Sequence, residues 1–113
     1  MKTASITKDI QYGEEKPKTQ VLLDSEAGKE IRIVFKKGQK MNEHQAPFPI
    51  TVEIFEGNIE FGVNGELLDM HRGDLVTLDS KVPHNLFAKE DSIVRLSLSK
   101  LDTAERANQA AGH

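Results

Sequence analysis

The sequence predicts a single all-β domain, a sandwich or barrel built from many short strands. Apolar residues recur at every second position over much of the chain, which is the spacing of half-buried strands. Turn-forming stretches rich in Gly, Asn and Asp separate these runs. The 113 residues are enough for one hydrophobic core, and 37% of them are hydrophobic, as in an ordinary globular chain.

Six segments are expected to be strands, the first two weaker than the rest: 5–11, 19–24, 29–35, 50–55, 59–63 and 94–99. In the third segment Ile31, Ile33 and Phe35 fall on one face. The pair Asn64-Gly65 follows 59–63 and predicts a tight hairpin, because a type I′ turn needs positive φ at both central residues.

Two stretches break the alternation. Ala46-Pro47-Phe48-Pro49 carries two prolines, which cannot donate to a strand ladder, so a loop or a sheet edge is expected there. In the tail, Asp102 and Glu105 have the spacing of a capping box and predict a short helix. The expected organisation is one domain over 1–113, with a core at 19–100, an N-terminal strand arm at 1–28 and a tail or short helix at 102–113.

Composition narrows the function classes. Fifteen basic and 18 acidic residues give a net charge of −3, so neither nucleic acid nor a membrane surface is expected as a partner. No apolar run approaches the roughly 20 residues of a membrane-spanning helix. The absence of cysteine excludes disulfides, thiolate metal sites and a cysteine nucleophile. The first ten residues lack the apolar stretch of a secretory signal, so a cytoplasmic location is expected.

Two spaced motifs resemble those of the cupin superfamily. The first motif, Gly-x5-His-x-His-x3-Glu-x6-Gly, is matched at Gly38, His44 and Gly57. The second, Gly-x5-Pro-x-Gly-x2-His-x3-Asn, is matched at Gly73 and His84. The resemblance covers about residues 19–100 and implies a double-stranded β-helix, the cupin jelly roll.

The departures from these motifs concern the metal that the resemblance implies. Cupins hold it with three histidines and a glutamate. At two of those four positions this chain has Ala46 and Ile50, or Thr51 in place of Ile50 if the spacer is one residue longer. His44 and His84 are the only matching ligands, and two imidazoles leave a divalent ion coordinated mostly by water. We therefore expect no metal cofactor, with a weakly bound divalent transition metal as the alternative.

The expected function is a small-molecule binding or sensing module with a largely metal-free pocket inside the β enclosure. One alternative is an enzyme, either a weakly metal-dependent oxygenase or isomerase, or a metal-free acid–base catalyst that uses His44 and His84. Another is a structural or regulatory dimer with a filled core. The residues expected to line the pocket are His44, Ala46, Ile50, Val52, Phe61, Val76, His84 and Leu86.

A homodimer is the expected assembly, because a small sandwich leaves edge strands that invite pairing. The apolar triplet Val21-Leu22-Leu23 suits a strand covered on both faces. Phe55, on the outer side of its strand, would give the contact an aromatic anchor.

Overall fold

The computed structural model describes residues 1–100, which form strands and loops and no helix. No described segment is therefore a helix able to cross a membrane. The helix expected at 102–113 lies outside the described residues. The strands are β1 (Lys18–Asp24), β2 (Gly28–Phe35), β3 (Lys40–His44), β4 (Ile50–Glu56), β5 (Asn58–Val63), β6 (Glu66–His71), β7 (Leu75–Leu78), β8 (His84–Ala88) and β9 (Ser92–Ser99).

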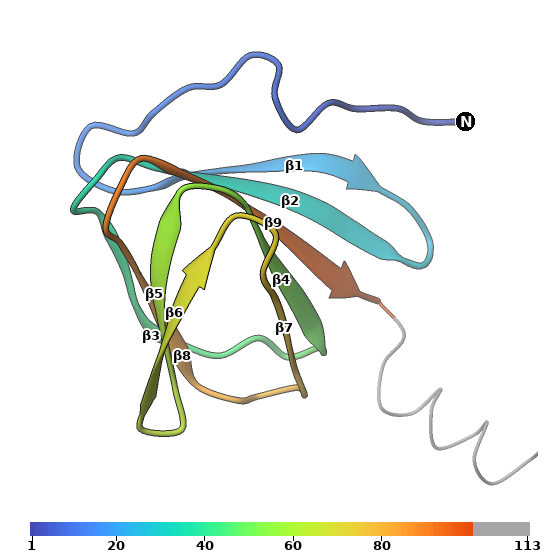
Figure 1. The fold of residues 1–113 in the computed structure, drawn as a ribbon. Coiled ribbons are helices and arrows are strands. Elements are labelled where there is room, and N and C mark those ends of the chain that lie inside the picture. The colour runs from blue at the N-terminus through green and yellow to red at the C-terminus, as the bar shows by residue number, and fades with distance from the viewer. Residues whose placement is uncertain (101–113) are drawn as a thin grey trace, which may run out of the picture.

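The strands form two antiparallel sheets that face each other as a sandwich (Figure 1). One sheet has five strands in the order β1-β2-β9-β4-β7, and the other has four in the order β3-β8-β5-β6. The chain crosses between the sheets repeatedly, which is the topology of a double-stranded β-helix. The predicted all-β jelly roll is confirmed, in its sandwich form.

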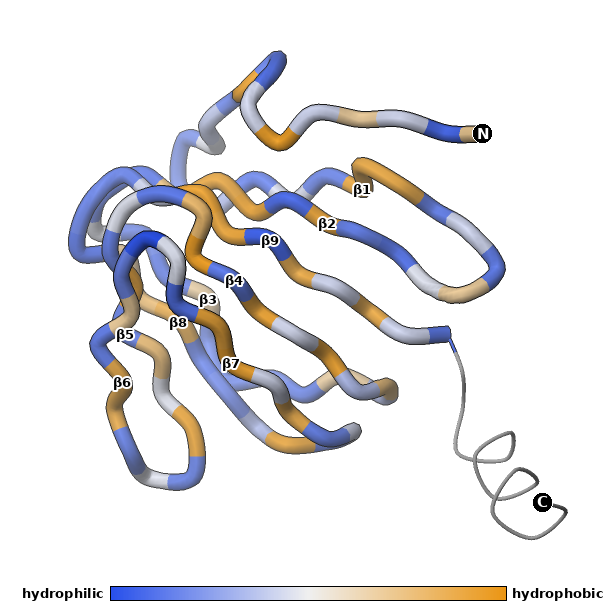
Figure 2. Tube along the Cα trace, turned by 45° about the vertical axis from the view of Figure 1, so that its right-hand side comes forward, coloured by the Kyte–Doolittle hydropathy of each residue, from blue (hydrophilic) through white to orange (hydrophobic). Residues whose placement is uncertain are grey.

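Period-two alternation places the core between the sheets. In β4, Ile50, Val52 and Ile54 are buried while the residues between them are partly exposed. Figure 2 shows the same alternation of hydrophobic and hydrophilic residues along β9 and β4. Burying one face of each strand against the other sheet supplies the main favourable free energy of folding. The buried core comprises Ile33, Phe35, Ile50, Val52, Ile54, Ile59, Phe61, Met70, Leu78, Leu86, Ala88 and Val94.

The predicted hairpin is present between β5 and β6. Asn64 and Gly65 have φ of 53° and 76°, the positive values that a type I′ turn needs. Gly57, at φ 97°, has a different constraint, because a Cβ there would stand 2.2 Å from Oγ of Ser92. The loop with two prolines lies between β3 and β4, as predicted.

The strand predicted at 5–11 is wrong. This segment pairs with no strand and runs along the outer side of β1 and β2 (Figure 1). Its backbone carbonyls instead accept hydrogen bonds from the guanidinium of Arg32, a β2 residue that is only 1% exposed. Gln39 adds a bond from Nε2 to the carbonyl of Gly13, at 2.8 Å. The backbone carbonyls of this segment, which would bond a neighbouring strand in a sheet, therefore accept hydrogen bonds from side chains instead.

Candidate ligand site: a histidine pair between the sheets

The four-stranded sheet brings the two motif histidines together. His44 ends β3 and His84 begins β8, and the two are direct cross-strand partners. Their ring centroids are 4.3 Å apart and the planes are tilted by 58°. Phe61 of β5 stacks on the other side of His84, with centroids 5.6 Å apart and planes within 9° of parallel. The His84 ring is thus held between an apolar ring and a second imidazole.

The two histidines differ in burial. His84 is 3% exposed, whereas His44 is exposed. Burial lowers the pKa of His84 from its ordinary value of 6.5, and a charge on His44 would lower it further. The carbonyl of Val82, which favours the protonated ring, opposes these effects without cancelling them. His84 is therefore the neutral, inner member of the pair, and His44 lies at the mouth.

Hydrogen bonds determine the tautomer of both rings. Nδ1 of His84 lies 2.9 Å from the carbonyl of Val82, and Nδ1 of His44 lies 2.8 Å from the carbonyl of Asn42. A carbonyl only accepts, so each Nδ1 carries a hydrogen and donates it. In the neutral rings Nε2 then holds a lone pair and accepts. Within residues 1–100 no group hydrogen-bonds either Nε2 atom.

A small cavity of about 100 Å³ lies beside the pair, between the two sheets. Apart from the two histidines and Thr19, its lining is entirely apolar. In the described part of the chain, Nε of Arg32 is the one fully enclosed side-chain nitrogen or oxygen without a hydrogen-bond partner. Because Nε2 of His84 also has no partner, it is not fully enclosed and borders open space. The lining residues are Thr19, Ile31, Ile33, Met41, His44, Val52, His84, Leu86, Val94 and Leu96.

The structure brings half of the expected pocket residues to this cavity. His44, Val52, His84 and Leu86 line it, and Phe61 supports it through the stack on His84. The other three expected residues lie elsewhere: Ile50 is a core residue, and Ala46 and Val76 are partly buried and packed against the core.

Sequence reasoning missed six lining residues, which come from β1, β2, β3 and β9. The signal for four of them was present: Ile31 and Ile33 were placed on one face of a predicted strand, and Val94 and Leu96 are at alternate positions of the strand predicted at 94–99. Only the sheet order, which puts β9 beside both β2 and β4, shows that these faces meet at one cavity. The remaining two are Thr19 and Met41.

The residues at this site do not fit the metal that the fold implies. No three His, Cys, Asp or Glu side chains are grouped as a metal site in residues 1–100. A divalent ion beside His44 and His84 would face apolar walls with no carboxylate to offset its charge, which is costly. The lone pairs on the two Nε2 atoms are therefore better suited to a ligand's hydrogen-bond donor.

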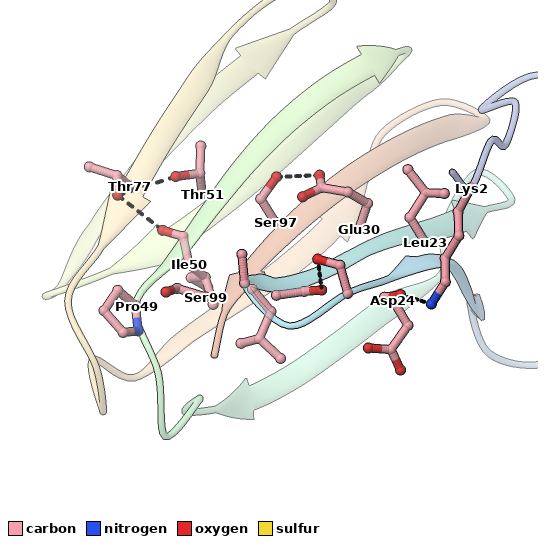
Figure 3. A pocket seen from close by; sticks show the side chains of 14 residues that line it. Lys2, Leu23, Asp24, Glu30, Pro49, Ile50, Thr51, Thr77, Ser97 and Ser99 are labelled. Atoms are coloured by element: carbon pink, nitrogen blue, oxygen red, sulfur yellow. Dashed lines mark hydrogen bonds between the residues drawn. The ribbon is translucent and has the colours of Figure 1, made fainter. Parts of the chain in front are cut away.

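A larger hollow of about 630 Å³ lies on the outer face of the five-stranded sheet (Figure 3). Its polar side chains mostly bond one another: Ser97 donates to Glu30, and Thr77 donates to the carbonyl of Ile50. Of the expected pocket residues only Ile50 lines it. We favour the smaller cavity as the ligand site, because its buried His84 has a free acceptor atom and the outer hollow is an open, internally bonded surface.

The fold and the inward histidine pair define a class of protein, a double-stranded β-helix domain with a pocket between its sheets. Comparison with solved structures identifies that fold. An RmlC-like cupin from Desulfovibrio desulfuricans superposes with a TM-score of 0.80 at 22% identity, covering 88% of this chain and 96% of the other. A cupin-superfamily protein from Desulfitobacterium hafniense gives 0.73 at 14%, covering 80% and 83%.

A double-stranded β-helix protein from Klebsiella pneumoniae gives a TM-score of 0.75 at 19% identity, covering 84% of this chain and 87% of the other. No family model and no curated protein matches the sequence. The protein therefore has the cupin fold, as the two motifs predicted.

Proposed function

We propose that this protein is a small-molecule binding or sensing module whose ligand occupies the cavity beside His44 and His84. The proposal includes a largely metal-free pocket, a homodimer and the expected cytoplasmic location. The cupin fold supports an inward-facing pocket as the place of binding, while the ligand follows from the residues of the pocket itself.

One observation carries the proposal: a buried imidazole holds an unpaired acceptor at an apolar cavity. No protein group bonds this Nε2 atom, and it is not fully enclosed, so a ligand group can reach it. Phe61 and the carbonyl of Val82 keep the His84 ring in this orientation. A ligand that donates to Nε2 would supply the hydrogen bond that no protein group makes and would bury its own apolar surface at the same time.

The cavity limits the size of the ligand. At about 100 Å³ it is well below the roughly 300–1,000 Å³ of sites for drug-sized molecules. The small volume also favours a second candidate function, a structural or regulatory dimer whose core is nearly full. The lowered pKa of His84 keeps acid–base catalysis as a third candidate, with neutral His84 as the base.

Leu96→Phe tests the binding proposal by filling the cavity from β9. Leu68→Phe is the matched control, because Leu68 is partly buried against the same core and does not line the cavity. A set of compounds with a single ring is screened by NMR against the full chain. We expect some of these compounds to bind and to change the NMR chemical shifts of the lining residues. We expect Leu96→Phe to abolish their binding. A set with no such binder contradicts the proposal and favours the filled core.

The same samples separate binding from catalysis. A ligand recovered unchanged after long incubation supports a binding module. Conversion that stops in His84→Phe and continues in His71→Phe supports the enzyme, since His71 lies exposed on β6 away from the cavity.

A further inference from the structure

We infer that the ligand is a small uncharged molecule that donates a hydrogen bond from a hydroxyl group to the histidine pair, an alcohol or a phenol with a body no larger than one ring. This inference rests on the proposed function and adds the chemical class of the ligand.

The first step is the direction of the hydrogen bond. Nδ1 of His84 donates to the carbonyl of Val82, so the neutral His84 ring presents only an acceptor to the cavity, at Nε2. A carbonyl or ether oxygen of a ligand is also an acceptor, so it could not form a hydrogen bond with Nε2. A hydroxyl supplies the missing hydrogen, and its oxygen can in turn accept from the hydroxyl of Thr19, the one other polar side chain of the lining.

The second step excludes charged ligands. Among the lining residues there is no Lys, Arg, Asp or Glu. A carboxylate would therefore enter an apolar site and meet the acceptor on His84, and an ammonium group would enter with no carboxylate. Moving an unpaired charge into such surroundings costs far more than moving a neutral hydroxyl that finds a partner.

The third step is size. An engineered apolar cavity of roughly 150 Å³ in another protein holds benzene. The present cavity, at about 100 Å³, is smaller, so it suits a short branched chain, and a single ring requires the apolar lining to move apart. Ile31, Ile33 and Val94 form flat, branched walls that suit such a body.

Phenol and toluene are the probes, because they share a shape and differ in one hydroxyl. Binding to the full-length, chelator-treated protein is measured by NMR for wild type, His84→Phe and His44→Phe, with His71→Phe as the exposed control. We expect His84→Phe to weaken phenol at least roughly fivefold and to leave toluene within twofold, since only phenol loses a hydrogen-bond partner. His44→Phe should act in the same direction, and His71→Phe should change neither affinity.

The outcomes separate this inference from the proposed function. If toluene binds and phenol does not, or if His84→Phe weakens both equally, the cavity binds ligands but the donor requirement is wrong. If neither probe nor any larger ring compound binds, the proposed function itself fails.

A measurement on the unaltered chain provides a second test if His84→Phe does not fold. The ¹⁵N shifts of the ligand-free protein report which ring nitrogen carries hydrogen. We expect Nδ1–H with an unprotonated Nε2 for His84. When phenol is added and donates a hydrogen bond to Nε2, the ¹⁵N resonance of Nε2 should move upfield. An Nε2–H tautomer would overturn the inference.

Discussion

At the residue scale, the inner histidine determines how the cavity responds to pH. His84 is buried between Phe61 and His44, so its pKa in the folded protein lies below 6.5, the value it regains on unfolding. Below about pH 6.5 the unfolded chain therefore binds a proton that the folded chain resists. Neutral His84 thus favours the folded state above that pH, and this contribution to the free energy of unfolding is lost as the pH falls.

The free energy of unfolding should accordingly fall between about pH 7 and pH 5, and His84→Phe should flatten the curve over that range. Chemical denaturation at a series of pH values measures it. Asp69 provides an internal comparison, because bonds from Asn58 and His71 lower its pKa to about 2. Its contribution is present above pH 3.8 and is lost only as the pH falls toward 2, so the Asp69 carboxyl does not itself produce the fall between pH 7 and pH 5. A curve that His84→Phe does not alter would contradict the burial of that ring.

Metal content is the second prediction at this scale. With Ala46 and Ile50 in place of two ligands, protein purified without a polyhistidine tag should hold well under one transition-metal ion per chain. Elemental analysis measures this. Near-stoichiometric metal that disappears in a His44→Ala, His84→Ala double variant would contradict it. Ala46→His combined with Ile50→Glu should raise metal uptake, and no gain would count against the alignment of the first motif.

The histidine pair could be predicted because the motif spacing identifies both residues, whereas the burial of Arg32 could not. Its partners are backbone carbonyls of 5–9 and Oε1 of Gln20, and backbone groups leave no trace in a residue pattern. An arginine at an outward-facing position of β2 was indistinguishable from a solvated one. The distinction depends on how the preceding chain folds back.

At the element scale, Arg32 fastens the N-terminal segment to the sheet. Its guanidinium reaches the carbonyl of Lys8 at 2.7 Å and that of Ile6 at 3.1 Å, and it bonds Gln20 at 2.7 Å. No carboxylate pairs with it among the described residues, so carbonyl dipoles stabilise the charge. This use of the carbonyls explains why 5–11 covers β2 without becoming a strand.

Arg32→Met should release the segment, because methionine fills the buried space and donates nothing. We expect a loss of about 2 kcal/mol in the free energy of unfolding and faster proteolysis within residues 1–17. Arg72→Met, at an exposed turn position, is the control and should cost under about 0.5 kcal/mol. Equal proteolysis of the two variants would show that Arg32 does not hold the segment.

Strand prediction succeeded where alternation was long and failed where strands are short. β2, β4, β5 and β9 were all predicted within a few residues of their observed bounds. β3 has one apolar residue and β7 has only four residues, and in β6 the adjacent Leu67 and Leu68 interrupt the alternation. For β6 the hairpin signal Asn64-Gly65 indicated that a strand follows.

At the scale of the whole molecule, β1 is the feature that bears on assembly. It forms one edge of the five-stranded sheet and pairs only with β2, so its other edge is free within the described chain. Val21 in this strand is 48% exposed, and Leu23 lines the outer hollow. Such an edge and face are what a second copy would cover.

A twofold dimer of about 25 kDa, twice the chain mass of 12.6 kDa, is therefore expected at micromolar concentration. Light scattering measures it. Deleting the first 24 residues removes β1 and should give monomer or aggregate. Phe55→Asp should weaken the dimer, while Phe87→Asp, on the outer face of the other sheet, should not. A sharp monomer peak for the full chain would contradict the dimer, and a stable truncated dimer would contradict only the part assigned to β1.

His84 and His44 share one apolar cavity, in which His84 stays neutral and free to accept a hydrogen bond. A ¹⁵N NMR titration of the histidines in the full chain tests it most directly. The structure predicts that His84 is unprotonated at pH 7 and that its pKa lies below 6.5. The pKa of His84 should change again when His44 is replaced by Phe. Two independent, solvent-like titrations near pH 6.5 would show that the rings do not share a cavity.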